Sequence, residues 1–145
     1  MRILGLDLGT RTLGISVSDA TGLIATPVKT IRFEEGNYES SLKELEELIK
    51  YYDVKELVLG LPKNMNGSMG FASERSLNYK TLLESKFNLK VHLVDERLTT
   101  VQAEKILLNQ DKSRKKRKKV IDNIASSIIL ETYLKEMRNK NGTSN

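Results

Sequence analysis

The chain has 145 residues, 39% of them hydrophobic, and a formal net charge of +5. It has no cysteine, which excludes a disulfide framework and thiolate metal sites. No uncharged stretch approaches the roughly 18 residues of a membrane span, and the strand-like start leaves no room for a signal peptide, so we expect one soluble, cytoplasmic domain.

The first part of the chain is predicted to form three strands. Residues 2–8 are an apolar run typical of a buried strand, and residues 13–19 alternate apolar and polar side chains like a half-exposed strand. A third strand is expected at 24–31, where Pro27 indicates a sheet edge or a bulge. Because the connections are short, these strands should form an antiparallel meander.

Helices and strands then alternate. The predicted elements are helix 39–52, strand 55–62, helix 70–87, strand 90–96, a helix opening at Thr99 with Gln102 as its capping-box partner, and a long helix over 120–137. This order predicts an α/β fold with a mixed five-stranded sheet and helices on both faces. We expect a single domain over 1–138, followed by a disordered polar tail at 139–145.

Acidic residues occur where packing alone would not select them. Asp7 interrupts an apolar strand, Asp95 and Glu96 end the fifth strand, and Asp122 lies in the first turn of the last helix. Since the carboxyl ends of parallel strands meet at one sheet edge, Asp7 and Glu96 should approach each other, and a helix crossing that edge could add Asp122. Three carboxylates form an all-oxygen site suited to Mg²⁺ or Mn²⁺, which can promote phosphodiester hydrolysis.

Simpler interpretations of these acids stay open. Asp122 alone could complement the helix dipole, and Asp95 or Glu96 could be a solvated acid at a strand end. Asp7 is the hardest to explain in this way, because an unpaired acid among leucines is costly unless a cation neutralises it. His92, the only histidine, is expected to point outward from its strand.

Positive charge is concentrated in one segment. Residues 112–119 hold seven cations, and the rest of the chain has 17 basic and 19 acidic residues. Such a run is either a solvated lysine-rich loop or a flexible arm that binds phosphates. The candidate contacts are Lys115, Lys116, Arg117 and Lys118.

The motifs "LDLGTRTLGISVSD", "LVLGLPKNMNGSMGFASERS", "VHLVDERLTT" and "KKVIDNIASSIILETYL" together resemble the YqgF family. Its members are described as Holliday junction resolvases and as nucleases that process pre-16S ribosomal RNA. The resemblance runs over roughly residues 2–137, and the combination of motifs is more specific than the first motif alone. It implies a ribonuclease-H-like fold and metal-dependent hydrolysis of nucleic acid, with Asp7, Glu96 and Asp122 as catalytic metal ligands and Asp95 as a candidate helper.

This chain departs from the family pattern at two positions. Thr12 follows Arg11 where many relatives have two successive cations, and Asn66 stands where an acid is common. Neither position is an expected metal ligand, so the departures bear on substrate contacts rather than on catalysis.

The loop after the fourth strand is the expected substrate-binding segment. Backbone N–H groups between Lys63 and Gly70, with Ser68 as a candidate helix N-cap, suit a phosphate. Beyond Ser68 and the basic run, the residues expected to contact nucleic acid are Arg11, Lys63, Arg75 and Arg97. An ordinary Asn-Gly turn with surface charges is the alternative, and for Arg75 the two interpretations weigh equally.

The sequence therefore predicts a nuclease that processes the 5′ end of pre-16S rRNA and associates with the ribosomal precursor, with structured RNA as its partner. A resolvase of branched DNA and a non-catalytic RNA-binding assembly factor are the alternatives. A nucleotide-binding lobe of the actin, Hsp70 or sugar-kinase type is disfavoured, because those proteins need two such lobes and no second D-x-G segment follows residue 9. Oligomeric state stays open.

Overall fold

The computed structural model of the chain describes residues 2–98 and 114–142, although not the side chains of 98, 114–123 and 141–142. Ten elements follow one another in these ranges. They are β1 (Arg2–Leu8), β2 (Thr12–Ser18), β3 (Ala25–Arg32), η1 (Tyr38–Ser41), α1 (Leu42–Tyr51), β4 (Val54–Leu61), α2 (Phe71–Phe87), β5 (Lys90–Asp95), η2 (Glu96–Leu98) and α4 (Arg114–Gly142), where η denotes a short 3-10 helix. The helix expected at Thr99 lies outside the described residues.

The five strands form one mixed sheet in the order β3-β2-β1-β4-β5. β1, β2 and β3 pair antiparallel, whereas β1, β4 and β5 run parallel, which confirms the predicted sheet. Pro27 lies on the edge strand β3, beside a register shift between Ile15 and Ser16 of β2. Both the expected edge and the expected bulge are present. Proline, which has no N–H, is tolerated at such positions because the sheet does not need that donor.

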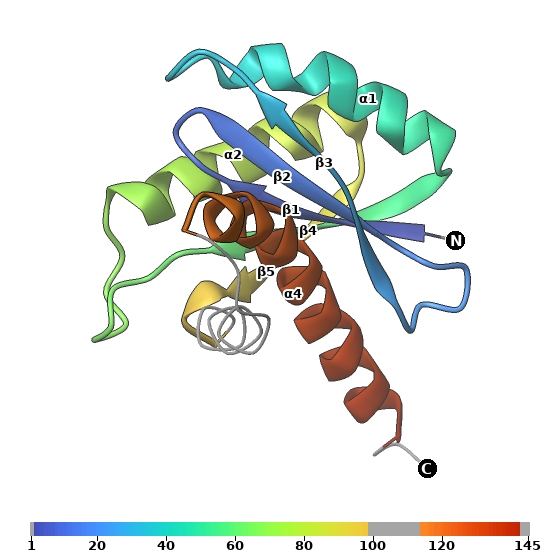
Figure 1. Ribbon diagram of the computed structural model, residues 1–145. Coiled ribbons are helices and arrows are strands. Elements are labelled where there is room, and N and C mark those ends of the chain that lie inside the picture. Colours follow the sequence, from blue (N-terminus) through green and yellow to red (C-terminus); the bar gives the residue numbers. More distant parts are fainter. Residues whose placement is uncertain (1, 99–113, 143–145) are drawn as a thin grey trace.

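Helices cover both faces of the sheet, as predicted (Figure 1). On one face Leu4 and Leu6 of β1 belong to the core with α1 and α2. On the other, Ile3 of β1 packs in a second cluster with Ile129 and Leu130 of α4. Side chains alternate along a strand, so the face of Ile3 is also the face of Asp7.

β2 is more buried than predicted. Its residues from Leu13 to Ser18 are all buried rather than alternately exposed, because α4 covers the face that carries the serines. Ser16 Oγ donates a hydrogen bond to the Ser126 carbonyl of α4 at 2.8 Å, and Ser18 Oγ accepts one from the Ile3 N–H at 2.9 Å. These bonds satisfy the two serine hydroxyl groups inside the protein, so the polar residues of this strand do not mark a solvent-exposed face.

α4 is longer than the predicted helix at both ends. It begins at Arg114, so the basic residues from Arg114 to Lys119 are helical rather than part of a flexible arm or loop. Lysine and arginine are good helix formers and no Gly or Pro separates them from Val120, which accounts for this correction. At the other end α4 continues to Gly142, so residues 139–142 are not the disordered tail that was expected.

Two smaller expectations are also corrected. The predicted helix 39–52 is divided into η1 and α1. His92 does not point into solvent: its ring lies 4.7 Å from the ring of Tyr133 on α4, and its Nε2 is 3.6 Å from Glu56 Oε1. Among the described helices, none is both long and apolar enough to span a lipid bilayer.

Candidate active site

Asp7 and Glu96 meet at the carboxyl edge of the parallel strands, as predicted. Asp7 is the sixth residue of β1, and Glu96 is the first residue after β5. Val94, two residues before Glu96, packs with Ile129 on the α4 face, so Glu96 continues that face and reaches Asp7. A hydrogen bond joins the two carboxyl groups.

The environment of Glu96 disfavours its charged form. Burial, the nearby charge of Asp7 and the hydrogen bond to Asp7 raise the pKa of Glu96 to about 8, and Asp95 adds to this effect. Without a cation, Glu96 therefore keeps its proton at neutral pH, and the two carboxyl groups stay joined by a hydrogen bond. A divalent cation would allow both groups to ionise, so the pair fits an all-oxygen metal site.

Gly60 makes room for Glu96. Gly60 lies on β4 between the strands that carry the two acids and pairs with Val94 of β5. A Cβ at residue 60 would overlap Oε1 of Glu96 and come within 2.6 Å of Ile129 Cδ1. Sequence reasoning missed this role, although a glycine inside an apolar strand is a known indication of close approach.

Asp122 lies on the helix that crosses this face. Its backbone belongs to α4, one turn before Ser126, whose carbonyl accepts the hydrogen bond from β2. The Asp122 side chain is outside the described part, so its distance from Asp7 and Glu96 is not defined. Within the described side chains, no three His, Cys, Asp or Glu residues form a metal-binding group.

Asp95 faces away from this pair and binds Arg97. Arg97 donates from Nε to both Asp95 oxygens, at 3.1 and 3.0 Å, and from Nη2 to Oδ2 at 2.6 Å. The Arg97 backbone N–H also donates to Asp95 Oδ1 at 3.0 Å. These bonds lower the pKa of Asp95, and the charge of Lys63 contributes. Asp95 and Arg97, predicted as a helper and a nucleic-acid contact, thus form a bidentate ion pair next to Glu96.

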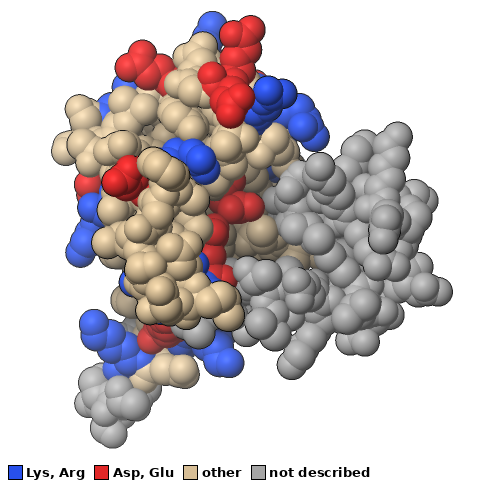
Figure 2. All heavy atoms as spheres, turned by 90° about the vertical axis from the view of Figure 1, so that its left-hand side faces the viewer, with Lys and Arg blue, Asp and Glu red and all other residues tan. Residues whose placement is uncertain are grey.

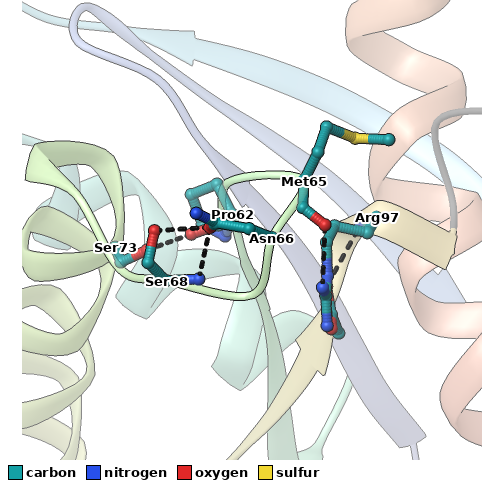
Figure 3. A network of polar contacts seen from close by, with 7 residues as sticks. Pro62, Met65, Asn66, Ser68, Ser73 and Arg97 are labelled. Carbon is teal, nitrogen blue, oxygen red and sulfur yellow. Dashed lines mark hydrogen bonds and ion pairs between the residues drawn. The ribbon is translucent and has the colours of Figure 1, made fainter.

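The loop between β4 and α2 is ordered by its own asparagines (Figure 3). Asn66 Oδ1 accepts hydrogen bonds from the Ser68 N–H at 3.0 Å and from Ser68 Oγ at 2.7 Å, while the Ser68 carbonyl accepts one from the Asn64 N–H at 2.9 Å. Arg97 Nη1 reaches the Met65 carbonyl at 3.5 Å and ties the loop to η2. Asn66 supplies the acceptor oxygen that an acid would supply at this position, so the departure from the family pattern keeps this contact.

Ser68 is not the N-cap of α2. Gly70 occupies that position and no side chain caps the helix, whereas Ser68 is held in the loop turn by Asn66. Ser73 in the first turn of α2 instead donates its hydroxyl to the Pro62 carbonyl, as Figure 3 shows. The Ser68 hydroxyl is hydrogen-bonded to Asn66 within the loop, so it does not cap the helix.

The expected basic contacts differ in their surroundings. Arg11 forms an exposed ion pair with Glu35 at 3.3 Å. Lys63 is half-buried near Asp95, and Arg75 makes no ion pair with any residue that the structure describes. The side chains of Lys115, Lys116, Arg117 and Lys118 lie outside the described part.

The metal-free protein is expected to lose stability as the pH rises from about 5 to about 8. Glu96 has a higher pKa in the folded protein than its ordinary value of 4.5, so the folded state keeps a proton that the unfolded state has released. Stability therefore falls with pH through this window. Thermal unfolding in the presence of a chelator would measure the slope, and Glu96→Gln should flatten it. An equal slope in the variant would contradict the assignment.

Comparisons with known proteins place these features in a family. A family model described as "RuvX: Holliday junction resolvase" matches residues 1–136. A protein of Geobacillus sp. (strain WCH70) named "Putative pre-16S rRNA nuclease" is 52% identical over 134 residues, which cover 92% of this chain and 97% of that protein. A protein of Bacillus subtilis (strain 168) with the same name is also 52% identical over 134 residues, with the same coverage of 92% and 97%.

Solved structures of resolvases share the fold at low sequence identity. RuvC of T. thermophilus, solved in complex with a Holliday junction substrate, has a TM-score of 0.59 and 11% identity, covering 94% of this chain and 96% of its own. The fowlpox virus Holliday junction resolvase has a TM-score of 0.54 and 16% identity, with coverage of 94% and 99%. The chain therefore has the RuvC-like, ribonuclease-H-like fold that the sequence predicted.

Proposed function

Because this chain belongs to the RuvX family, whose description is Holliday junction resolvase, we propose that it is a metal-dependent nuclease that processes the 5′ end of pre-16S rRNA in the cytoplasm. The observation that carries the catalytic part is the contact between Asp7 and the buried Glu96, whose pKa is raised to about 8 first by burial and then by the charge and hydrogen bond of Asp7. Two carboxyl groups held together at a strand edge are costly without a cation. The choice of substrate follows the names of the relatives.

Asp7, Glu96 and Asp122 are the proposed catalytic ligands of Mg²⁺ or Mn²⁺. When bound, such an ion activates water and stabilises the leaving oxygen in phosphodiester hydrolysis. Asp7 and Glu96 contribute oxygen donors from neighbouring parts of the sheet, and Gly60 lets Glu96 lie across β4. The support for Asp122 is its place on α4, one turn before the Ser126 contact with β2.

Asp95 is assigned to positioning rather than to metal binding. Its bidentate bonds to Arg97 fix the turn that carries Glu96, and Arg97 in turn contacts the Met65 carbonyl of the neighbouring loop. The pair thereby holds both sides of the site in register without contacting the reacting phosphate.

Cations around the sheet edge are proposed to bind the substrate backbone. Lys63 begins the loop after β4, and Arg11 lies in the turn after β1. Ser68 and Arg97 are hydrogen-bonded within the protein, to Asn66 and Asp95. Both are proposed substrate contacts that require the loop to rearrange and release these bonds. The basic residues Lys115, Lys116, Arg117 and Lys118 on α4 are proposed to bind phosphates without reading bases.

Cleavage assays with two substrates test the proposal. Purified protein is incubated with RNA that spans the 5′ end of 16S rRNA in its precursor, and with a four-way DNA junction, in Mn²⁺, Mg²⁺ or a chelator. We expect metal-dependent cleavage of the RNA. Cleavage of the junction alone would favour the resolvase function that the family description states. Binding without cleavage in any metal would instead favour a non-catalytic assembly factor.

A further inference from the structure

A groove of about 320 Å³ lies between η1 and the first half of α2. This volume is at the lower end of the range found for small-ligand pockets. The residues that line it are Tyr38, Phe71, Glu74, Arg75, Asn78, Tyr79 and Leu82. None of them has been given a role in the proposed cleavage except Arg75, which the sequence suggested as a contact for nucleic acid.

The groove has a fixed floor and an exposed rim. The rings of Tyr38 and Tyr79 pack edge to face with centroids 6.1 Å apart, and the Tyr79 hydroxyl is hydrogen-bonded to Ser41 Oγ at 2.7 Å. At the rim, Phe71 exposes 87% of its surface. A large apolar ring that is this exposed to solvent at the start of a helix is unusual, because its burial would stabilise the fold.

Charged and polar groups stand beside the exposed ring. Arg75 lies one helical turn after Phe71, and it makes no ion pair with a described residue. Asn78 follows one turn later and offers both a donor and an acceptor, while Glu74 offers acceptors only. An aromatic ring, a guanidinium that no described carboxylate pairs with, and an amide together match the parts of a nucleotide: the face of a base, a phosphate and the hydrogen-bonding edge of the base.

The groove lies at the same edge of the sheet as the acidic pair. α2 follows the carboxyl end of β4, next to the residue that makes room for Glu96. The connecting loop, residues 64–70, has no charged residue, and its Met65 and Met69 are 90% and 58% exposed. Figure 2 looks at this edge of the sheet from the left-hand side of Figure 1. Acidic side chains gather near the middle of the view, beside a surface without charged side chains. α2 lies on the opposite face of the sheet from the acids, so a strand cut at the acids would cross the sheet edge over this loop to reach α2.

We propose that this groove binds one unpaired nucleotide of the substrate, with its base stacked on Phe71 and its phosphate held by Arg75. The inference rests on the proposed function in so far as the ligand is a nucleic acid, and it adds that the substrate is single-stranded next to the cleavage point. A base within a duplex is stacked on both sides and cannot present its face to Phe71. The groove thus selects single-stranded segments, of RNA or DNA, by a chemistry that every base shares.

Binding measurements separate this inference from cleavage. Fluorescence anisotropy is followed for a labelled single-stranded RNA, the same RNA as a duplex, and a single-stranded DNA of the same sequence. The Asp7→Asn protein with Mn²⁺ serves as the background, so that bound strands stay intact. Phe71→Ala and Arg75→Gln are compared in it with Tyr51→Ala, an aromatic residue that is 80% exposed outside the groove.

The two groove variants should differ in a defined way. Phe71→Ala should raise the Kd for single strands about tenfold, the order expected for one lost base stack, and leave the dependence on salt unchanged. Arg75→Gln should lower the slope of log K against log salt by about 0.7, the contribution of one phosphate contact on a single strand. Tyr51→Ala should bind single strands as the background protein does, and neither groove variant should change duplex binding. The losses of affinity should be equal for single-stranded RNA and DNA.

Several results would overturn the inference. Unchanged affinity of Phe71→Ala for single strands would do so, as would an equal loss for the duplex or for Tyr51→Ala. If wild type cleaves no substrate while Phe71→Ala still binds single strands more weakly, the nuclease proposal is wrong and the nucleotide-binding role of the groove is supported. If wild type cleaves and Phe71→Ala binds normally, the groove fails alone.

Discussion

Asp7→Asn is expected to reduce the rate of metal-dependent cleavage by about three orders of magnitude. The amide removes a charged oxygen from the proposed metal site of Asp7 and Glu96, and a metal ion supplies several kcal/mol of charge stabilisation in the transition state. Each 1.36 kcal/mol corresponds to about a factor of ten in rate. The measurement is single-turnover cleavage of the RNA substrate by purified wild type and variant, with circular dichroism as the control for folding.

The same substitution should not destabilise the metal-free protein. Burial raises the pKa of Glu96 most, and the Asp7 charge adds to it; Asn at residue 7 removes that charge, so the variant should be equally or more stable at pH 8 in a chelator. Added Mn²⁺ should raise the melting temperature of wild type more than that of the variant, by mass action. A variant that cleaves like wild type, or that is markedly destabilised without metal, would indicate a structural role for Asp7.

The sequence was sufficient for the fold because its local patterns agree with its tertiary structure. Short connections determined the antiparallel meander, and the apolar run at 55–62 is indeed a central parallel strand between β1 and β5. The prediction was wrong for β2, because serine is a polar residue that is usually exposed and the strand was therefore expected to be half-exposed. Its serines are buried because the α4 backbone and the Ile3 N–H satisfy their hydroxyl groups, and a contact of this range is not visible in a local pattern.

The candidate site was predictable to the extent that it follows from strand direction. Parallel strands brought Asp7 and Glu96 together, and side-chain alternation put Asp95 on the opposite face. The role of Arg97 was not predictable, because proximity in sequence to the site suggested a substrate contact and gave no information about its bidentate partner. The groove at Phe71 was missed since an aromatic residue at a helix start resembles a core residue until its exposure is known.

Gly60→Ala is expected to affect both the stability of the protein and the position of Glu96. The new methyl group would overlap Glu96 Oε1 and approach Ile129 Cδ1 to 2.6 Å, so the Glu96 side chain must leave its place next to Asp7. Overpacking of this kind costs about 1–3 kcal/mol of unfolding free energy. Cleavage should fall about a hundredfold or more, since a displaced Glu96 no longer shares the proposed metal site with Asp7.

Gly5→Ala is the matched control for this substitution. Its Cβ would lie 2.6 Å from Ser16 Oγ and 2.7 Å from both the Ser126 carbonyl oxygen and Leu130 Cβ, so it also strains the packing of α4, and Glu96 is not among its three nearest neighbours. Both variants should unfold more easily: in Gly5→Ala the α4 backbone at Ser126 must shift, and in Gly60→Ala the Glu96 carboxyl group and the end of the Ile129 side chain must move. Only Gly60→Ala should lose the fall in metal-free stability between about pH 5 and pH 8, since that fall depends on the burial of Glu96 and on its contact with Asp7. If Gly60→Ala keeps the full pH dependence, Glu96 has not moved, and the close approach at residue 60 does not position the catalytic pair.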